Sequence, residues 1–292
     1  MHPALSDASS TSPLNKTSSL YVVATPLGNL QDMSLRALAV LKAVDAVAAE
    51  DTRHSQRLLD AFDIRTRLVA LHEHNEQEAA GLVIRMLEEG KQVALITDAG
   101  TPAVSDPGAR AVARVQDAGF PVVPVPGACA AIAALSASGL ADGHFHFHGF
   151  LPTKSAARKS ALDALRGVPG TLVFYEAPHR IAETLDDLAA TLEPTRQIVV
   201  ARELTKMFEQ IVRMPLADAP AWLAADANRA RGEFVLLVSA APASEGLSPE
   251  AERVLGLLLA ELPVKQAAKL AAAITGASKN ALYERALELR DS

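Results

Sequence analysis

Cysteine and long apolar runs are almost absent from this sequence, and each absence excludes a class of protein. The 292 residues contain a single cysteine, Cys129, so an internal disulfide framework is excluded. The longest apolar runs, such as residues 20–24 and 234–238, fall far short of the roughly 20 residues of a membrane-spanning helix. Residues 1–19 are rich in Ser and Thr and lack the apolar core of a signal peptide. We therefore expect a cytoplasmic protein without a membrane segment.

Several enzyme signatures are missing as well. The chain has no GxGxxG after its first strand-like run, no GxxxxGK[ST] and no GxSxG. These absences remove support for a dinucleotide-binding fold, a P-loop nucleotide hydrolase and an esterase nucleophile elbow. The net charge of −6 argues against a surface coated with cations, so any nucleic-acid binding must use local basic patches.

The composition, 49% hydrophobic and 21% charged, is that of a globular chain with enough apolar material for two moderate domains and an appendage. Residues 1–19 predict a disordered tail. From residue 20 onward, short apolar runs alternate with helix-length segments, which indicates a first α/β domain over 20–138 with a largely parallel sheet. Its strand-like runs are 20–24, 46–49, 67–71, 92–96 and 121–125.

The alternation then restarts, with a boundary near 138–143, and predicts a second α/β domain over 143–241. Its last two strand-like runs suggest some antiparallel pairing, so this sheet should be mixed. The strand-like runs are 144–148, 171–175, 197–201, 209–213 and 233–239, and the helices between them are 154–166, 179–191 and 216–227.

A third piece, residues 249–292, has apolar residues at three- and four-residue spacing over 249–261, 264–275 and 278–289. Two of these short helices meet at Thr275 and Gly276 and resemble a helix-turn-helix in outline. A role in nucleic-acid binding and a purely structural role both remain open for this helical tail.

Four loops of small residues follow strands of the predicted first sheet, at 25–29, 50–53, 97–102 and 126–129. Loops that follow parallel strands gather at one sheet edge, where ligands bind. The pattern therefore indicates a cofactor held by backbone groups. The alternative is that Pro and Gly only mark turns.

Charged residues stand at the second of these loops. Glu50, Asp51 and Arg53 directly follow a buried strand, where charge is costly unless it is paired or used in chemistry. The alternative for Asp51 is a helix cap beside an exposed arginine.

Two histidine groups invite a metal hypothesis. His144, His146 and His148 would project from one face of a strand, and residues 72–76 read HEHNE. Neither group has the ligand spacing of a known zinc motif, so we predict no metal site and interpret 72–76 as a polar loop of a cleft.

The basic residues that could bind a nucleic acid are concentrated in a few segments of the chain. If they converge on a cleft between the domains they would hold phosphates, and otherwise they form solvated helix faces. The candidates for substrate binding are Lys154, Arg158, Lys159, His179, Arg180 and Lys206.

At these loops the sequence resembles the tetrapyrrole methylase superfamily, most closely its ribosomal RNA small subunit methyltransferase I branch. The resemblance spans residues 20–240 in nine ordered strings. They are TPLGNLQDMSLRAL at 25–38, AEDTR at 49–53, LHEHNE at 71–76, TDAGTPAVSDPG at 97–108, PVPGA at 124–128, GFLPTK at 149–154, FYEAPHRI at 174–181, ARELTK at 201–206 and RGEFVLLV at 231–238.

The resemblance implies two α/β domains with S-adenosylmethionine in the cleft between them, followed by a small C-terminal helical segment. It also implies 2′-O-methylation of a cytidine in the decoding region of 16S ribosomal RNA, within the small ribosomal subunit, and a homodimer. The cofactor residues that it implies are Leu27, Gly28, Asp98, Ala99, Gly100, Thr101, Pro102, Gly127, Ala128, Cys129, Ala130, Tyr175, Glu176 and Glu203.

For catalysis the resemblance implies a proton acceptor after the second strand. This maps onto Asp51, or its neighbour Glu50, with Arg53 placing phosphate or ribose. A positioned base typically accelerates such a reaction by about 10²–10⁴-fold. Two alternatives remain, namely methylation of a tetrapyrrole-like small molecule and a non-catalytic ribosome-assembly factor.

Overall fold

The computed structural model describes residues 12–72, 76–140, 143–242, 247 and 249–291. It divides into two compact units, which comprise residues up to Ala240 and from Ala241 onward. The first unit contains two five-stranded sheets, and the second is a bundle of three helices. The predicted fold class is confirmed. The domain limits proposed from the sequence remain a prediction, and part of the proposed boundary, 141–142, lies outside the described residues.

The first sheet is entirely parallel, with the strand order β3-β2-β4-β1-β5. Short β-branched and alanine-rich runs form its strands, as the alternating pattern predicted. The strands are β1 (Leu20–Val23), β2 (Ala46–Ala49), β3 (Arg67–Ala70), β4 (Val93–Ile96) and β5 (Val122–Val125).

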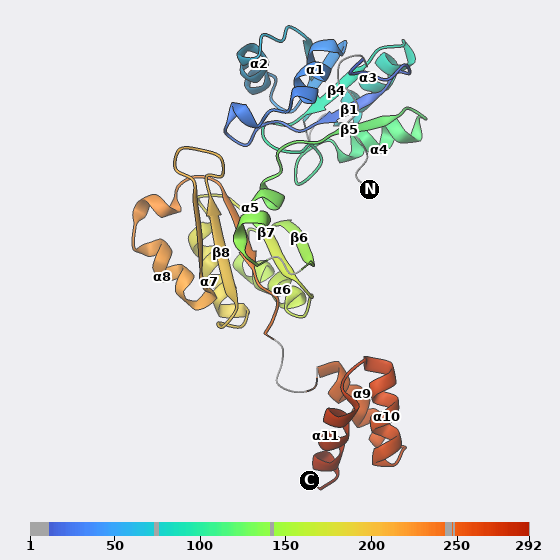
Figure 1. Ribbon diagram of the computed structural model, residues 1–292, viewed down its shortest axis with the longest axis vertical. Coiled ribbons are helices and arrows are strands. Elements are labelled where there is room, and N and C mark those ends of the chain that lie inside the picture. Colours follow the sequence, from blue (N-terminus) through green and yellow to red (C-terminus); the bar gives the residue numbers. More distant parts are fainter. Residues whose placement is uncertain (1–11, 73–75, 141–142, 243–246, 248, 292) are drawn as a thin grey trace, which may run out of the picture. The chain divides into compact units, whose positions relative to one another are not determined.

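Helices cover both faces of this sheet (Figure 1). One face packs on α1 (Leu35–Ala43) and α2 (Thr52–Ala61), and the other packs on α3 (Glu76–Glu88) and α4 (Ala109–Asp117). Because both faces are buried, the strands read as continuous apolar runs instead of alternating ones.

Glu76 shows how a distant side chain can complete a helix. Its carboxylate, at the start of α3, accepts hydrogen bonds from the backbone N–H groups of Gly108 (3.1 Å), Arg110 (2.9 Å) and Ala111 (3.3 Å). It therefore caps the amino terminus of α4, whose own N-cap residue, Gly108, has no side chain to do so. The polar cleft loop predicted over 72–76 ends at this structural residue, and 73–75 lie outside the described residues.

The second sheet is mixed, with the strand order β6-β7-β10-β8-β9. β6 and β7 are parallel and the other pairs are antiparallel, so the prediction of a mixed sheet is confirmed. The strands are β6 (Phe145–Phe150), β7 (Thr171–Glu176), β8 (Gln197–Arg202), β9 (Gln210–Pro215) and β10 (Phe234–Val238).

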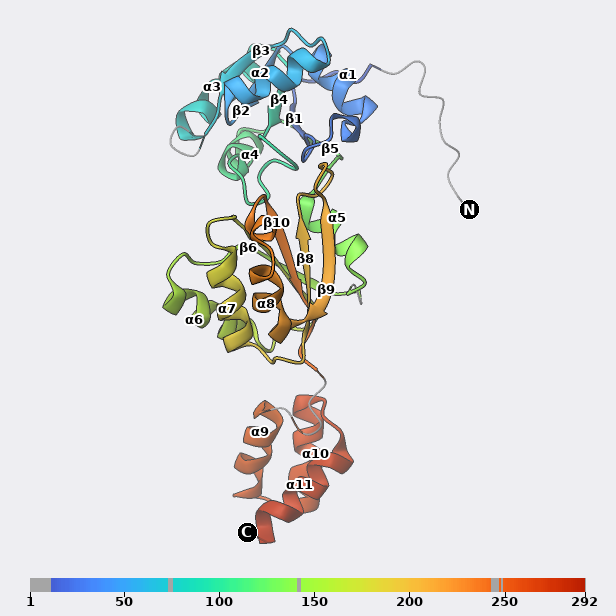
Figure 2. The same ribbon diagram turned by 90° about the vertical axis from the view of Figure 1, so that its left-hand side faces the viewer.

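Helices cover both faces of the second sheet too (Figure 2). α6 (Ser155–Leu165), α7 (Ile181–Thr191) and α8 (Ala219–Ala224) pack on one face. α5 (Ala130–Ser138) packs on the other, although the sequence assigned its residues to the first domain. The predicted helix 216–227 is wrong in extent, because 3₁₀ turns flank α8 at Leu216–Asp218 and Ala227–Ala230.

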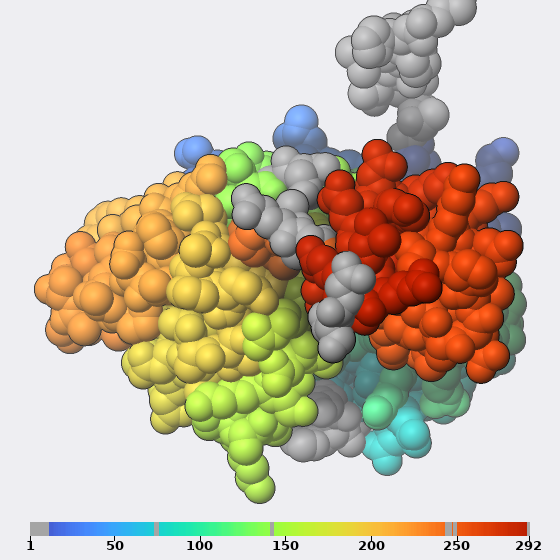
Figure 3. Space-filling model, turned by 90° about the horizontal axis from the view of Figure 1, so that it is seen from below, coloured from blue at the N-terminus to red at the C-terminus, as the bar shows by residue number. Residues whose placement is uncertain are grey.

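The second unit has its own apolar core, formed by α9 (Pro249–Leu259), α10 (Val264–Thr275) and α11 (Lys279–Asp291). Figure 3 shows the outer surface of this unit in orange and red. Its buried residues include Leu255, Ala268 and Leu282. α10 ends at Gly276, which adopts a left-handed conformation (φ 72°) that suits glycine. In the described part of the chain no helix is long and apolar enough to cross a membrane.

A buried ion pair joins α6 to α7. The guanidinium of Arg158 is fully buried and donates through Nε to Asp187 Oδ2 at 2.7 Å, with Glu183 as a second partner at 3.3 Å. A charge held this way becomes very costly when its partner is removed.

We expect Asp187→Ala to destabilise the first unit by about 3 kcal/mol, because Glu183 alone cannot compensate the buried guanidinium. Chemical denaturation measures this change. The matched control is Asp163→Ala, which removes an exposed ion pair with Arg166 and should cost under about 1 kcal/mol. Equal losses in the two variants would contradict the prediction.

Candidate functional site

A cavity of about 370 Å³ lies in the first unit, between loops of the first sheet and strands of the second. This volume is in the range of small-molecule sites, about 300–1,000 Å³. Its lining residues are Leu27, Ala99, Gly100, Thr101, Val104, Ser105, Asp106, Cys129, Ala130, Phe150, Tyr175, Glu176, Ala177, Pro178, Leu204, Glu233, Phe234 and Val235.

An isolated antiparallel bridge fixes the loops after β1 and β4 against each other. Thr25 N–H donates to the Gly100 carbonyl at 2.8 Å, and Gly100 N–H donates to the Thr25 carbonyl at 3.0 Å. The Thr25 hydroxyl also donates to the Thr97 carbonyl at 3.0 Å. Gly100 adopts φ +83°, where a side chain would be strained, and its added Cβ would lie 3.3 Å from Leu27.

The loop after β5 joins this arrangement. The Thr101 hydroxyl donates to the Ala128 carbonyl at 3.0 Å. Gly127 packs so closely on Ala24 that an added Cβ would lie 2.9 Å from the alanine Cβ. Three loops that follow three parallel strands thus form one wall of the cavity.

The second sheet supplies the opposite wall. Tyr175 packs edge-on against Phe147 and Phe150, and its hydroxyl accepts a hydrogen bond from Ala131 N–H at 3.2 Å. Burial, and then the neighbouring Cys129, raise the pKa of Tyr175 above its ordinary value, so the phenol stays protonated.

Glu176 is buried and fully partnered. Its carboxylate lies 3.2 Å from Arg180 Nε and accepts from the Thr184 hydroxyl at 2.6 Å and from Ala177 N–H at 2.8 Å. Arg180 also donates to the Leu151 carbonyl at 2.6 Å. These contacts hold both charges inside the fold.

Three carboxylates gather around Thr97 at the carboxyl edge of the first sheet. The Thr97 hydroxyl donates to Glu50 at 2.9 Å, and Asp98 accepts from Asp51 N–H at 3.3 Å. Burial raises the pKa of Asp106 to about 7, and the negative charges of Glu50 and Asp98 add to the shift.

Asp51, the predicted base, is the N-cap of α2. Its carboxylate accepts from Arg53 N–H at 2.8 Å and from His54 N–H at 3.3 Å. The bond from Arg53, and then that from His54, lower the pKa of Asp51 below its ordinary value. Arg53 is 91% exposed at its side chain, and neither residue lines the cavity. The placement matches the alternative of a helix cap beside an exposed arginine.

The structure brings together part of the predicted cofactor set. Those in the cavity wall are Leu27, Ala99, Gly100, Thr101, Cys129, Ala130, Tyr175 and Glu176. The structure does not place the others in the cavity wall, namely Gly28, Asp98, Pro102, Gly127, Ala128 and Glu203. Gly28 packs on Lys206, and an added Cβ would clash with the lysine side chain.

Sequence reasoning missed other parts of the wall. Val104, Ser105 and Asp106 belong to the same loop as Gly100, and the similar string at 97–108 already contained them. The other missed residues also lie inside strings that carry the resemblance, although none was assigned to the site. They are Phe150, Ala177, Pro178, Leu204, Glu233, Phe234 and Val235.

Most predicted substrate-binding cations are paired within the protein. Arg158 is fully buried, and Lys159 lies 3.3 Å from Asp187. Lys206 is shared between Glu203 at 3.1 Å and Glu233 at 2.8 Å. A further pair joins Arg180 to Glu176.

Only Lys154 and His179 of the predicted substrate-binding set are exposed without an ion pair among the described residues.

The histidines of β6 do not form a cluster of metal ligands. A bulge interrupts the register between Phe147 and Gly149, and the rings of His146 and His148 lie 6.3 Å apart. Within the described residues, no group of three or more His, Cys, Asp or Glu is arranged to hold a metal ion.

Comparison with protein families gives two matches. Residues 19–220 match the model described as Tetrapyrrole (Corrin/Porphyrin) Methylases, and residues 245–290 match the model described as RsmI C-terminal HTH domain.

Curated relatives match along nearly the whole chain. The chain is 56% identical over 272 residues to the Pseudomonas aeruginosa protein named ribosomal RNA small subunit methyltransferase I, covering 92% of this chain and 96% of the relative. It is 52% identical over 275 residues to the Escherichia coli O157:H7 protein of the same name, covering 94% and 96%.

Solved structures share the fold. The methyltransferase CobJ superposes with a TM-score of 0.58 at 21% identity, covering 77% of this chain and 95% of that chain. Uroporphyrin-III C-methyl transferase from Thermus thermophilus, complexed with S-adenosylhomocysteine, gives a TM-score of 0.55 at 21% identity and covers 76% and 97%.

We expect Asp106→Asn to raise the melting temperature of the protein. The native pKa of about 7 lies above the ordinary value of 3.8, so ionisation favours the unfolded chain, and wild-type stability falls as pH rises from about 4 to 7. The gain in the variant should therefore be small at pH 4, grow up to about pH 7, and stay constant above it. Calorimetric melting across this range measures it, and a gain independent of pH would contradict the assignment.

Proposed function

This chain belongs to the tetrapyrrole (corrin/porphyrin) methylase family, in its ribosomal RNA small subunit methyltransferase I branch, and from this membership we propose that it methylates ribosomal RNA. The methyl donor is S-adenosylmethionine and the acceptor is a ribose 2′-hydroxyl of the small subunit. The finer assignment, a cytidine in the decoding region of 16S RNA, is part of the proposal. A ribosomal substrate places the enzyme in the cytoplasm.

The cavity is the observation that carries the donor assignment. Small residues line part of its wall, including Ala99 and Gly100 after β4 and Ala130 at the start of α5. Carboxylates lie on the opposite side and in the loop after β4, and negative charge stabilises a sulfonium cation. When bound, S-adenosylmethionine supplies an electrophilic methyl group on a positively charged sulfur.

The main contribution of the wall residues is to hold the reacting groups in position. The Thr25–Gly100 bridge and the bond from Thr101 to Ala128 hold three loops in one geometry before any ligand arrives. Fixing two reacting groups in line can lower a barrier by roughly 7–11 kcal/mol. Methyl transfer from a sulfonium needs this alignment of oxygen, carbon and sulfur.

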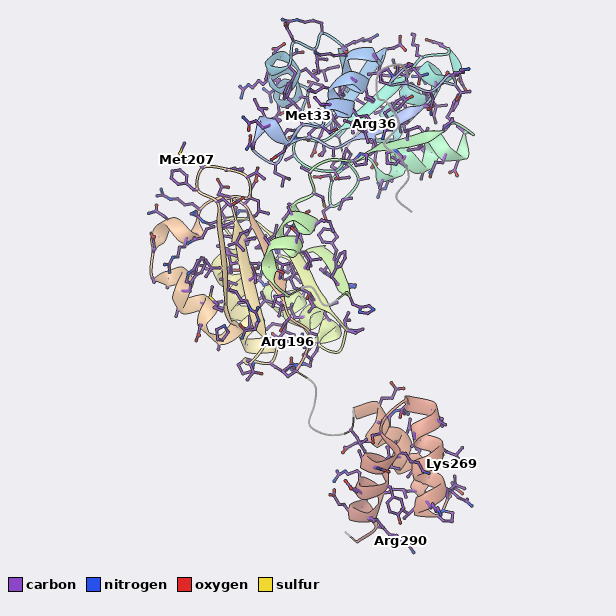
Figure 4. All side chains as sticks on the ribbon, in the orientation of Figure 1. Met33, Arg36, Arg196, Met207, Lys269 and Arg290 are labelled. Atoms are coloured by element: carbon purple, nitrogen blue, oxygen red, sulfur yellow. The ribbon has the colours of Figure 1, made fainter. Side chains whose placement is uncertain are left out.

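We infer that the predicted substrate-binding cations of the first unit make few phosphate contacts, because four of the six are already paired within the protein. Exposed cations on the helices of the second unit are available, such as Lys269 and Arg290 (Figure 4). Each phosphate contact adds about 0.9 or less to the slope of log affinity against log salt. We therefore infer that shape recognition of an assembled small subunit supplies the remaining affinity.

The direct test of the function uses small subunits from a strain that lacks this methyltransferase. Labelled S-adenosylmethionine should transfer methyl to their RNA, and mapping should place the modification on a 2′-oxygen of one cytidine. Methylation of precorrin-like compounds instead would establish the tetrapyrrole alternative. Absence of any transfer, with retained RNA binding, would establish the assembly factor. The mass of the enzyme in solution tests the proposed homodimer.

We expect Gly100→Ala to weaken binding of S-adenosylhomocysteine at least about tenfold, or about 1.4 kcal/mol. The added methyl group enters the wall beside Leu27 in a strained backbone conformation. Gly90→Ala is the matched control, because Gly90 has nearly the same φ, +84°, but open space around it. Calorimetry should show wild-type affinity in the control. Wild-type affinity in both variants would remove Gly100 from the cofactor site.

Removal of residues 249–292 should weaken binding to the small subunit while cofactor affinity stays the same. The apolar cores of the first unit contain no residue of this segment, so the truncated chain keeps its cavity. Binding to subunits at several salt concentrations measures the loss. Full activity of the truncated protein on subunits would return the helices to a purely structural role.

A further inference from the structure

Three carboxylates line the cavity, and their partners differ. Glu176 is buried against Arg180 and the Thr184 hydroxyl, and Glu233 lies 2.8 Å from Lys206. Asp106 has no ion pair with a cation in the described part of the chain. Its charged neighbours are the carboxylates Glu50 and Asp98. Among the three carboxylates, Asp106 is thus the one that no cation of the described residues neutralises.

The loop that carries Asp106 is held in a strained conformation. Ala103 and Ser105 both adopt positive φ, 67° and 60°, which costs a non-glycine residue of order 1–3 kcal/mol each. The Ser105 side chain fills the space beside Gly149, where an added Cβ would lie 2.6 Å from the serine oxygen. The second sheet therefore helps to fix the position of Asp106 in the wall.

We propose that Asp106 is the general base that removes the proton of the acceptor hydroxyl; this inference rests on the proposed function. Asp106 accepts the proton of the ribose 2′-hydroxyl as the hydroxyl oxygen bonds to the methyl carbon. The bond between that carbon and sulfur breaks, and its electron pair stays on sulfur. Asp106 ends protonated and returns its proton to water after the products leave.

The surroundings of Asp106 suit this role. Burial, then the negative charges of Glu50 after β2 and Asp98 after β4, raise its pKa to about 7. Across the cavity, Tyr175 is a neutral phenol, and its pKa is raised in part by Asp106. A base works best when its pKa lies near the working pH.

The surroundings of Asp51 favour its ionised form, in contrast to those of Asp106. Two backbone N–H groups and Arg53 hold its pKa below the ordinary value, so it is a weaker proton acceptor. It also lies outside the cavity wall. The loss of a cap explains any instability of an Asp51 variant without a catalytic role.

The experiment compares wild type, Asp106→Asn, Asp106→Glu and Asp51→Asn. Single-turnover methylation of small subunits is measured between about pH 5.5 and 9, with calorimetric binding of S-adenosylhomocysteine. The wild-type rate should rise tenfold per pH unit in the acid range and level off at or below about pH 7, because the positive sulfur of the bound donor favours the ionised carboxylate. Asp106→Asn should bind the product normally, fall by about 10²–10⁴-fold and lose this pH dependence. Asp106→Glu should recover part of the rate.

A readout without substrate or cofactor accompanies the rates. The stability of the free wild-type protein should fall as pH rises from about 4 to 7, and this titration should be missing in Asp106→Asn. A wild-type rate and pH profile in Asp106→Asn would overturn the inference and leave the function intact. Loss of the pH dependence in Asp51→Asn alone would transfer the role to Asp51. Failure of wild type to methylate subunits would overturn the proposed function itself.

Discussion

The common direction of the strands in the first sheet is the constraint on which the rest of the site depends. Because β1, β2, β4 and β5 are parallel, the loops that follow them emerge at one edge. Two backbone hydrogen bonds between Thr25 and Gly100 then lock two of these loops together. These hydrogen bonds make neighbours of side chains far apart in the sequence, and the cavity forms between this edge and the second sheet.

Charge is distributed unevenly around this cavity. Cations that the sequence assigned to RNA binding, such as Arg158 and Lys206, form ion pairs within the protein. Asp106, in contrast, has no cation partner among the described residues. A ligand with positive charge at its reacting centre suits such a wall. RNA phosphates do not, so contacts to the RNA backbone must lie outside the cavity.

The strands and helices could be predicted from periodic patterns in the sequence. Contacts between residues far apart in the chain could not. The strands were predicted to within one or two residues because β-branched runs between turn residues have few other solutions. The loop containing Gly100 was singled out, but the resemblance was carried over only as far as Pro102, so Asp106 was missed. The burial of Arg158 depends on Asp187 in another helix, and the cap that Glu76 gives to α4 depends on tertiary packing. The packing of α5 on the second sheet likewise leaves no local signal.

The position of α5 ties the two sheets together in a further way. Its first residue, Ala130, lines the cavity, while its buried face belongs to the core of the second sheet. A molecule that contacts both Ala130 and Gly100 therefore connects the part of the unit built on the second sheet with the part built on the first sheet. By mass action, such a ligand favours states in which both cores are folded. The two halves of this unit should then lose their individual melting behaviour as the cofactor concentration rises, and unfold as one cooperative body.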